Sequence, residues 1–409
     1  MSALQSAVSS LGMERTILTG ALLLDGTGAP PVAGRAVVVE HGRISAVVST
    51  SEAPSGTTLR LDGLTLLPGL VNMHVHLCFG GEADPAASLQ RDPQALTVIK
   101  AALRARQTVE AGVTTVRDLG GREYAELSVR DAIRQGLIPG PRVLCAGKGI
   151  CMTGGHGWNL IGREADGPDD ARKAVREQLK AGADVIKIFA TGGVMTPGVE
   201  PNSAQLTLDE VRAAIEEARK AGRRTAAHAM GGDGIANCLE AGITTIEHGV
   251  FLTEALCARM ARDGVALVPT LIAPAAIAAG GVAAGIPEYA VRKSLAVADR
   301  HLEGFRLALG AGVPIAAGTD AGTPLNPHGT LVPELALMVK GGMAPGAAIH
   351  AATAAAARAL GLEHETGRIA PGLAADLVAV DGDPAERVEA LDDVRLVMAQ
   401  GRIVVDRLK

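Results

Sequence analysis

"LPGLVNMHVHL", residues 67–77, is an apolar run that opens on Pro-Gly and ends with His74 and His76, one residue apart. Before it, residues 15–66 show the period-two alternation of short strands, broken by Asp-Gly and Gly-Thr-Gly turns. After it, apolar runs alternate with stretches of helical spacing such as "LTLDEVRAAIEEARKAG", residues 206–222. This second pattern predicts repeated βα units around a parallel sheet.

Eight apolar runs of this kind follow one another, each with room for a helix behind it. The fold class is therefore predicted to be α/β, with a (β/α)₈ TIM-like barrel over residues 67–364. A doubly wound open sheet is the alternative, but no strand is followed by a GxGxxG turn. The runs are "GLVNMHVHL" (69–77), "TTVRDLGG" (114–121), "PRVLCAG" (141–147), "DVIKIFATGG" (184–193), "RTAAHAMG" (224–231), "TTIEHGV" (244–250), "ALVPTL" (266–271) and "IAAGTDAG" (315–322).

The two ends of the chain share a β pattern. Alternation like that of the N-terminal part returns after residue 365, in residues 366–386 and 393–406. Neither end has enough strands to bury a face alone. We therefore expect residues 1–66 and 365–409 to pair into one small β-sandwich domain beside the barrel.

Composition limits the partners. The 409 residues are 47% hydrophobic, and the net charge of −5, the scattered Lys and Arg and the 2% aromatic content argue against nucleic acid. No apolar run could cross a bilayer, and residues 1–16 lack the pattern of a targeting segment. Five cysteines without CxxC spacing fit a reducing compartment. We expect a cytoplasmic protein that acts on a small molecule, does not bind membranes and forms a homo-oligomer.

Polar side chains fall at the carboxyl ends of the predicted strands, where a barrel keeps its chemistry. His74 and His76 are separated by one residue and therefore share one face of the first strand. The fourth, fifth, sixth and eighth strands each add one more such side chain. These are Lys187, His228, His248 and Asp320.

Each of these residues alone has an ordinary explanation, such as a helix cap or a lysine that reaches solvent. Together they do not, because burying so many polar groups unpaired at one end of a barrel is strongly unfavourable. Two divalent cations would supply partner charges, and this ligand set suits zinc, with manganese, iron or cobalt as alternatives. The Lys187 ammonium would repel cations, whereas an amine carboxylated by CO₂ would become an anionic bridge between them.

The segments "GLVNMHVH", "VIKIFATGG", "AAHAMG", "TIEHG", "GTDAG" and "GRIAPGLAADLVAVDGDP" resemble the metal-dependent amidohydrolase superfamily, in its Xaa-Pro dipeptidase-like and imidazolonepropionase-related branch. The resemblance covers nearly the whole chain. It implies one metal held by His74, His76 and Asp320, a second held by His228 and His248, and an N6-carboxylated Lys187 that bridges them. Because related deaminases usually lack this lysine, Lys187 favours a binuclear amide hydrolase over a deaminase.

A glycine-rich segment after the third strand, "CMTGGHGW", residues 151–158, contains His156. In the resembled dipeptidases a histidine in this context contacts the substrate carbonyl oxygen; alternatively, His156 only orders its loop. We expect a metal-bridging hydroxide to be the nucleophile, because bound cations acidify water. Asp320 is then the candidate that accepts its proton and passes it to the leaving amine.

Substrate contacts are predicted from position only. Arg117, Tyr289 and His328 are candidates, since dipeptidase-like members bind a product carboxylate with groups from the barrel loops. Each has an alternative: Arg117 pairs with Asp118 or a neighbouring strand-end carboxylate, Tyr289 packs, and His328 lies in a surface turn. Trp158 follows His156 and is a candidate lid or cavity wall.

The sequence thus predicts a binuclear metal-dependent amidohydrolase that cleaves an N-acyl amino acid or a dipeptide. A carbamate, urea or other xenobiotic amide is the alternative substrate on the same site, because barrel loops change substrate without changing the fold. A mononuclear deaminase or cyclic-amide hydrolase and a non-catalytic barrel are the alternative functions. The remaining histidines receive no role: His41, His301, His350 and His364.

Overall fold

The computed structural model describes residues 15–408. Residues 1–14 and Lys409 lie outside the described residues. Residues 1–14 contain most of the stretch expected to lack a targeting segment and the start of the predicted small β domain. Within residues 15–408, none of the helices combines the length and the hydropathy needed to span a bilayer.

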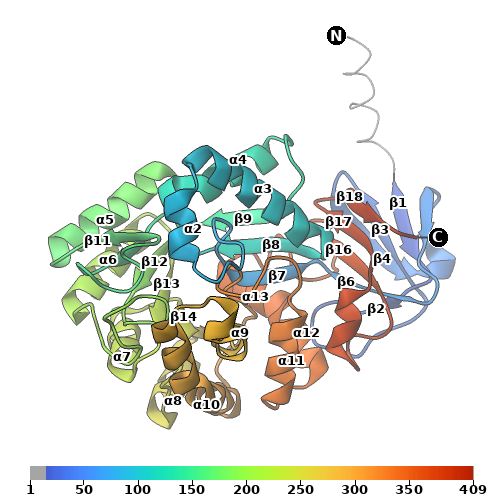
Figure 1. Ribbon diagram of the computed structural model, residues 1–409. Coiled ribbons are helices and arrows are strands. Elements are labelled where there is room, and N and C mark those ends of the chain that lie inside the picture. The colour runs from blue at the N-terminus through green and yellow to red at the C-terminus, as the bar shows by residue number, and fades with distance from the viewer. Residues whose placement is uncertain (1–14, 409) are drawn as a thin grey trace, which may run out of the picture.

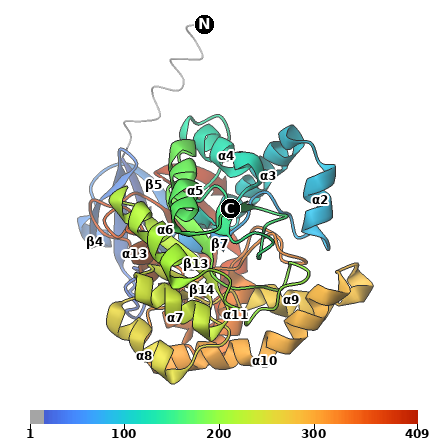
Figure 2. The same ribbon diagram turned by 90° about the vertical axis from the view of Figure 1, so that its left-hand side faces the viewer.

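Parallel strands form the centre of the molecule, with helices outside them in both views (Figures 1 and 2). One sheet has the order β7-β8-β9 and the other β11-β10-β12-β13-β14-β15. All pairs within them are parallel. The strands are β7 (Leu70–Val75), β8 (Val113–Asp118), β9 (Arg142–Cys145), β10 (Gly149–Cys151), β11 (Gly162–Glu164), β12 (Val185–Phe189), β13 (Arg224–Ala229), β14 (Thr245–His248) and β15 (Ala266–Val268).

Backbone hydrogen bonds close the two sheets into a barrel. On one side, the Asp184 N–H donates to the Cys145 carbonyl at 2.8 Å and so joins the strand after it to β9. On the other side, residues 314–321 lie between β15 and β7: Ala316 N–H donates to Leu267 O at 3.0 Å, and Met73 N–H to Ala317 O at 2.9 Å. The predicted barrel is confirmed, although its eighth member pairs only through isolated bridges and is not a regular strand.

Helix α6 illustrates how the sequence places a helix on the barrel wall. Thr207 and Glu210 form a capping box at its start. Its buried residues Val211, Ala214 and Ala218 recur at spacings of three and four, which gives one apolar stripe. The helices are α2 (Pro85–Arg91), α3 (Gln94–Glu110), α4 (Ala125–Arg134), α5 (Pro168–Ala181), α6 (Leu208–Lys220), α7 (Gly232–Ala241), α8 (Glu254–Asp263), α9 (Ile272–Gly280), α10 (Glu288–Gly310), α11 (Val332–Lys340), α12 (Pro345–Ala351) and α13 (Ala354–Leu360), with 3₁₀ turns η1 (Thr50–Glu52), η2 (Arg122–Tyr124), η3 (Val282–Ala284) and η4 (Val388–Asp392).

Two further sheets lie beside the barrel, where Figure 1 shows the blue and red ends of the chain together. Their orders are β4-β3-β1-β5 and β18-β17-β16-β6-β2. The antiparallel pair β6·β16 joins the two ends of the chain in one sheet. Leu18 and Val37 of the first sheet share a buried cluster with Leu66 and Leu396 of the second. The strands are β1 (Thr16–Thr19), β2 (Leu22–Leu23), β3 (Arg35–Glu40), β4 (Arg43–Ser49), β5 (Thr57–Arg60), β6 (Leu64–Pro68), β16 (Leu377–Asp381), β17 (Val394–Ala399) and β18 (Arg402–Asp406).

A buried carboxylate connects these sheets to the barrel. Asp376, just before β16, accepts hydrogen bonds from Arg142 Nη2 at 3.2 Å, Thr366 Oγ1 at 2.9 Å and the Gln400 N–H at 2.7 Å. Its side chain is 1% exposed, so these three donors replace all of its water. Because Arg142 opens the barrel strand β9, the contact fixes the two parts of the chain against each other.

We expect Asp376→Ala to lower the free energy of unfolding by about 3 kcal/mol, because it leaves two hydrogen-bond donors without this partner and leaves Arg142 with only the more distant Glu365 carboxylate, at 3.7 Å. Urea unfolding followed by far-ultraviolet circular dichroism measures the loss. The control is Asp381→Ala, since Asp381 pairs with Arg395 at a side chain that is 52% exposed; it should cost about 1 kcal/mol or less. Equal losses in the two variants would contradict the role of Asp376.

Candidate metal centre

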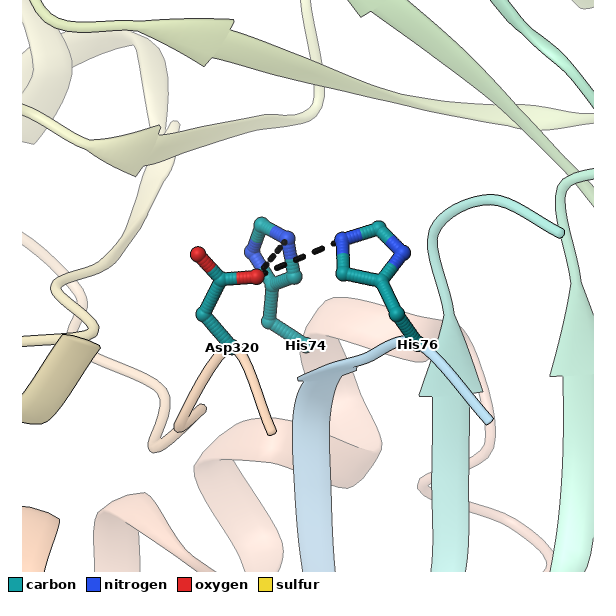
Figure 3. A group of neighbouring side chains, drawn as sticks. All are labelled: His74, His76 and Asp320. Atoms are coloured by element: carbon teal, nitrogen blue, oxygen red, sulfur yellow. Dashed lines mark ion pairs between the residues drawn. The ribbon is translucent and has the colours of Figure 1, made fainter. Parts of the chain in front are cut away.

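Three side chains converge at the carboxyl end of β7 (Figure 3). Nε2 of His74 and Nε2 of His76 each lie 3.3 Å from Oδ1 of Asp320. Both rings are buried, and Asp320 comes from the segment that closes the barrel. Among residues 15–408, these residues are the one group of three His, Cys, Asp or Glu ligands whose ligand atoms all lie within 4.8 Å of one another. The group could therefore hold one cation.

Protein acceptors orient both rings. His74 Nδ1 lies 3.0 Å from Glu247 Oε2, and His76 Nδ1 lies 2.9 Å from the Gly120 carbonyl. Since each Nδ1 donates to an oxygen, each Nε2 keeps its lone pair and faces Asp320. This arrangement is typical of metal-binding histidines, whose second nitrogen is fixed by a carboxylate or a carbonyl.

Glu247 is itself held by a buried network, of which the sequence indicated only that Arg117 could pair with a strand-end carboxylate. Its Oε1 accepts hydrogen bonds from Arg117 Nη2 at 2.7 Å and from Thr245 Oγ1 at 2.5 Å. Arg117 Nε donates to the Met73 carbonyl at 2.7 Å, which ties the network back to β7. Arg117 and Glu247 form a fully buried ion pair through Glu247 Oε1. The other carboxylate oxygen, Oε2, is the one that fixes His74.

A second group lies next to the first. The His228 and His248 ring centroids are 4.5 Å apart, and His248 is 5.3 Å from the His74 ring. His228 Nε2 lies 2.9 Å from the Gly192 carbonyl and His248 Nδ1 lies 2.6 Å from Thr270 Oγ1, so one nitrogen of each ring stays available. The buried Lys187 Nζ lies 5.4 Å from the Phe189 ring centroid and has no hydrogen-bond acceptor within the described chain.

Burial sets the charge states of these groups. It lowers the pKa of His74, His228 and His248 well below the usual histidine value, so the rings are neutral. It also lowers the pKa of Lys187 to about 8. Burial alone would raise the pKa of Asp320, but the neighbouring His74, His76 and Lys187 hold it at about 2. Neutral imidazoles beside an ionised carboxylate are the protonation states that a divalent cation requires.

Comparison with known proteins agrees with this geometry. The sequence model of the amidohydrolase family matches residues 65–404. The chain belongs to the amidohydrolase family. It is 32% identical to an ochratoxinase of Aspergillus niger over 93% of this chain and 84% of that protein. It is 29% identical to an imidazolonepropionase of Salinispora tropica over 85% of each chain.

A solved structure supports the same assignment. A Xaa-Pro dipeptidase with bound methionine in its active site superimposes with a TM-score of 0.87 and 33% identity, over 95% of this chain and 99% of that one. The resemblance to the dipeptidase-like and imidazolonepropionase-related branch is thus confirmed, as is the TIM-like barrel. This amidohydrolase is a hydrolase of amide carbon–nitrogen bonds.

The predicted ligands of the amidohydrolase line one cavity together with His156: His74, His76, Lys187, His228, His248 and Asp320. The His156 ring centroid is 4.3 Å from that of His228, and burial lowers the pKa of His156 to about 3. Its Nδ1 lies 2.9 Å from Thr196 Oγ1, which accepts the Gly157 N–H at 3.0 Å. Since that hydroxyl still has its own proton to donate to Nδ1, the neutral ring can carry its proton on Nε2.

The other predicted contacts do not line this cavity. Arg117 pairs with Glu247, which is the neighbouring-carboxylate alternative. Tyr289 donates to the Met195 carbonyl at 3.3 Å, and His328 Nε2 lies 2.9 Å from the Phe79 carbonyl. The structure therefore gives no support to substrate binding by these three residues. Trp158 follows His156 and is half exposed, and it also lies outside the lining.

Sequence reasoning missed several supporting residues. His301, which received no role, is buried with Nε2 at 2.7 Å from the Pro269 carbonyl and 3.1 Å from the His248 carbonyl. It therefore connects the ends of β14 and β15. Thr270 and Thr196 orient the rings of His248 and His156, respectively, through hydrogen bonds to Nδ1. Only Glu247 left a signal, as a carboxylate inside the apolar run "TTIEHGV".

We expect Glu247→Gln to lower the affinity for the bound cation by about 10–100-fold, because a neutral amide holds His74 less firmly and leaves Arg117 without its counter-charge. Competition with a chelator on the purified protein measures this. Glu240→Gln is the matched control, since Glu240 is about half exposed and pairs with Arg259. Unchanged affinity in Glu247→Gln would refute the orienting role.

Gly193 makes room for His156. A Cβ at this position would lie 2.5 Å from His156 Nε2, so Gly193→Ala must displace the ring. Under the predicted role of His156 as a donor to the reacting oxygen, we expect kcat to fall about 100-fold while bound metal is unchanged. Gly232→Ala is the control, because its Cβ would meet no atom closer than 3.7 Å. Loss of metal in Gly193→Ala would instead make His156 a ligand.

Proposed function

We propose that this amidohydrolase binds two divalent cations and hydrolyses an acyclic amide bond. The observation that carries the proposal is the convergence of the histidines on one cavity, each with one ring nitrogen fixed by the protein and one available. His74, His76 and Asp320 would hold the first cation and His228 and His248 the second. The nitrogen and oxygen donors suit zinc, with manganese, iron and cobalt as alternatives.

Lys187 supports the binuclear form. A buried ammonium without an acceptor would be unfavourable, and it would also repel both cations. Addition of CO₂ to the neutral amine forms an N–C bond and releases one proton, which leaves a carbamate whose single negative charge is shared by two oxygens. That carbamate would give each cation one oxygen ligand. Carboxylation would thus remove a buried ammonium that has no hydrogen-bond acceptor among the described residues.

The residues around the cavity divide the remaining work. When bound, the cations would acidify a water and polarise the scissile carbonyl. The Asp320 carboxylate, ionised at neutral pH, would accept the proton of the attacking water and deliver it to the leaving nitrogen. His156 would donate from Nε2 to the carbonyl oxygen as negative charge develops there.

Two substrate classes are open to this reaction. N-acyl amino acids and dipeptides are supported by the likeness to a Xaa-Pro dipeptidase. Carbamates, ureas and other neutral amides are the second class, because their hydrolysis would break the same type of carbonyl carbon–nitrogen bond. A mononuclear deaminase or cyclic-amide hydrolase is the second candidate function, since among the described residues only one group of three ligands, His74, His76 and Asp320, has all its ligand atoms within 4.8 Å of one another.

The domain organisation is part of the proposal. Residues 1–66 and 365–409 would form one small β-sandwich domain, and residues 67–364 the catalytic barrel. The buried cluster shared by Leu18, Val37, Leu66 and Leu396 supports this division.

The decisive measurement is the metal content of protein purified without added metal, together with hydrolysis of a panel of amides. We expect about two equivalents per chain, as in a two-metal site. Lys187→Ala should lose at least half of the metal and nearly all turnover, because both cations lose their shared ligand. Asp320→Asn should keep part of the metal but lose nearly all turnover.

Lys180→Ala is the control, since Lys180 is exposed on α5 and should change neither quantity. One equivalent that is unchanged in Lys187→Ala would contradict the binuclear proposal and favour the mononuclear alternative. Ammonia release without cleavage of an acyclic amide would favour a deaminase.

A further inference from the structure

Apart from the candidate ligands, His156 and Thr323, the cavity wall is apolar. Its side chains include Phe79, Ile161, Phe189, Val194, Met230 and Ile277. Among the described residues that line it, Lys187 is the only one with a basic amino or guanidinium group, and Thr323 is the only one with a hydroxyl group. A Lys187 that carries CO₂ would no longer be a cation. The wall therefore offers no positive side chain to a substrate.

The walls are continuous with the core on both sides. Phe79, Ile161 and Phe189 belong to one buried cluster, and Val194 and Met230 belong to another. All five side chains are at most 5% exposed. Their positions are therefore set by packing, and a large rearrangement to bring in a polar group would disrupt the core.

The basic side chains bonded to the surrounding loops already have partners. Lys293 donates to the carbonyls of Gly193, Thr196 and Val199. Arg104 donates to Leu77 O and pairs with Glu82, and Arg117 is neutralised by Glu247 as described above. None of these three side chains lines the cavity, so a carboxylate that entered it would lose its water without gaining a hydrogen bond or an ion pair from them, which is costly.

We propose that the substrate is an uncharged amide, carbamate or urea with apolar substituents, and that a free carboxylate next to the scissile bond is selected against. This inference rests on the proposed function. It chooses the neutral class over N-acyl amino acids and dipeptides with a free carboxyl end.

Met230 is the position at which this selection is most easily altered. It follows His228 by two residues at the end of β13, and its N–H donates to Thr191 Oγ1 at 3.0 Å, which fixes its backbone. The side chain is 4% exposed and lines the cavity. A cationic side chain here would stand beside the second ligand group.

The test compares two compounds that differ only in one carboxylate, N-benzoyl-L-phenylalanine and N-benzoylphenethylamine, on the metal-containing enzyme. We expect kcat/KM to be at least about tenfold higher for the neutral amide, because an unpaired charge costs more than the 1.4 kcal/mol that a tenfold change represents. Equal values or a preference for the acid would overturn the inference and leave amide hydrolysis intact.

Variants show whether the wall is responsible. Met230→Arg should raise kcat/KM for the acid relative to the neutral amide at least about tenfold, whereas Met230→Leu should keep the wild-type order. Val282→Arg adds the same charge on an exposed turn outside the cavity and should change nothing. If Met230→Arg does not fold, as judged by circular dichroism, the wild-type comparison decides alone.

Absence of hydrolysis for every amide tested would contradict the proposed function and not this inference. Calorimetric titration of the metal-containing enzyme with the same two compounds then decides. Tighter binding of the neutral amide by about tenfold would support the inference, and equal or tighter binding of the acid would overturn it.

Discussion

Burial of many ionisable side chains at one end of the barrel is the constraint on which the rest of the structure depends. Neutral imidazoles and one ionised carboxylate are stable there only if each polar atom finds a partner. The histidines meet this requirement in the same way: one ring nitrogen bonds to Glu247, Thr270, Thr196 or a backbone carbonyl. The second nitrogen of each ring, which has no such partner among the described residues, faces one shared cavity. These nitrogens are the atoms available to bind a cation.

Backbone strain accompanies this arrangement. His248, Thr270 and Asp320 have φ angles of 72°, 52° and 57°, in the left-handed region that residues with side chains seldom adopt. Each costs about 1–3 kcal/mol. All three lie at or just beyond the end of a barrel strand, and each contributes a side chain to the site or fixes one. The surrounding packing supports conformations that direct these side chains to the centre.

These strained positions also explain what could and could not be predicted from the sequence. The eight runs were predictable, and so was the gathering of the six candidate ligands at one cavity, because each falls in the carboxyl-terminal part of a predicted strand: His74, His76, Lys187, His228, His248 and Asp320. The regular eighth strand was a wrong expectation, since a left-handed Asp320 interrupts pairing in residues 315–322.

Alternation fails similarly at the end of β14, where it would send neighbouring residues to opposite faces. Both Glu247 and His248 nevertheless contact His74, because the left-handed φ of His248 ends the pleat. The Arg117–Glu247 pair joins strands far apart in the chain, so no local pattern marks it. The cavity wall shares this dependence on distant contacts: Lys293 of α10 bonds three carbonyls of the segment that carries Val194. Because buried contacts fix both the candidate ligands and the cavity wall, the shape of the cavity is set. Under the proposed function, substrate selectivity then depends on which substrate groups can be transferred from water into that cavity.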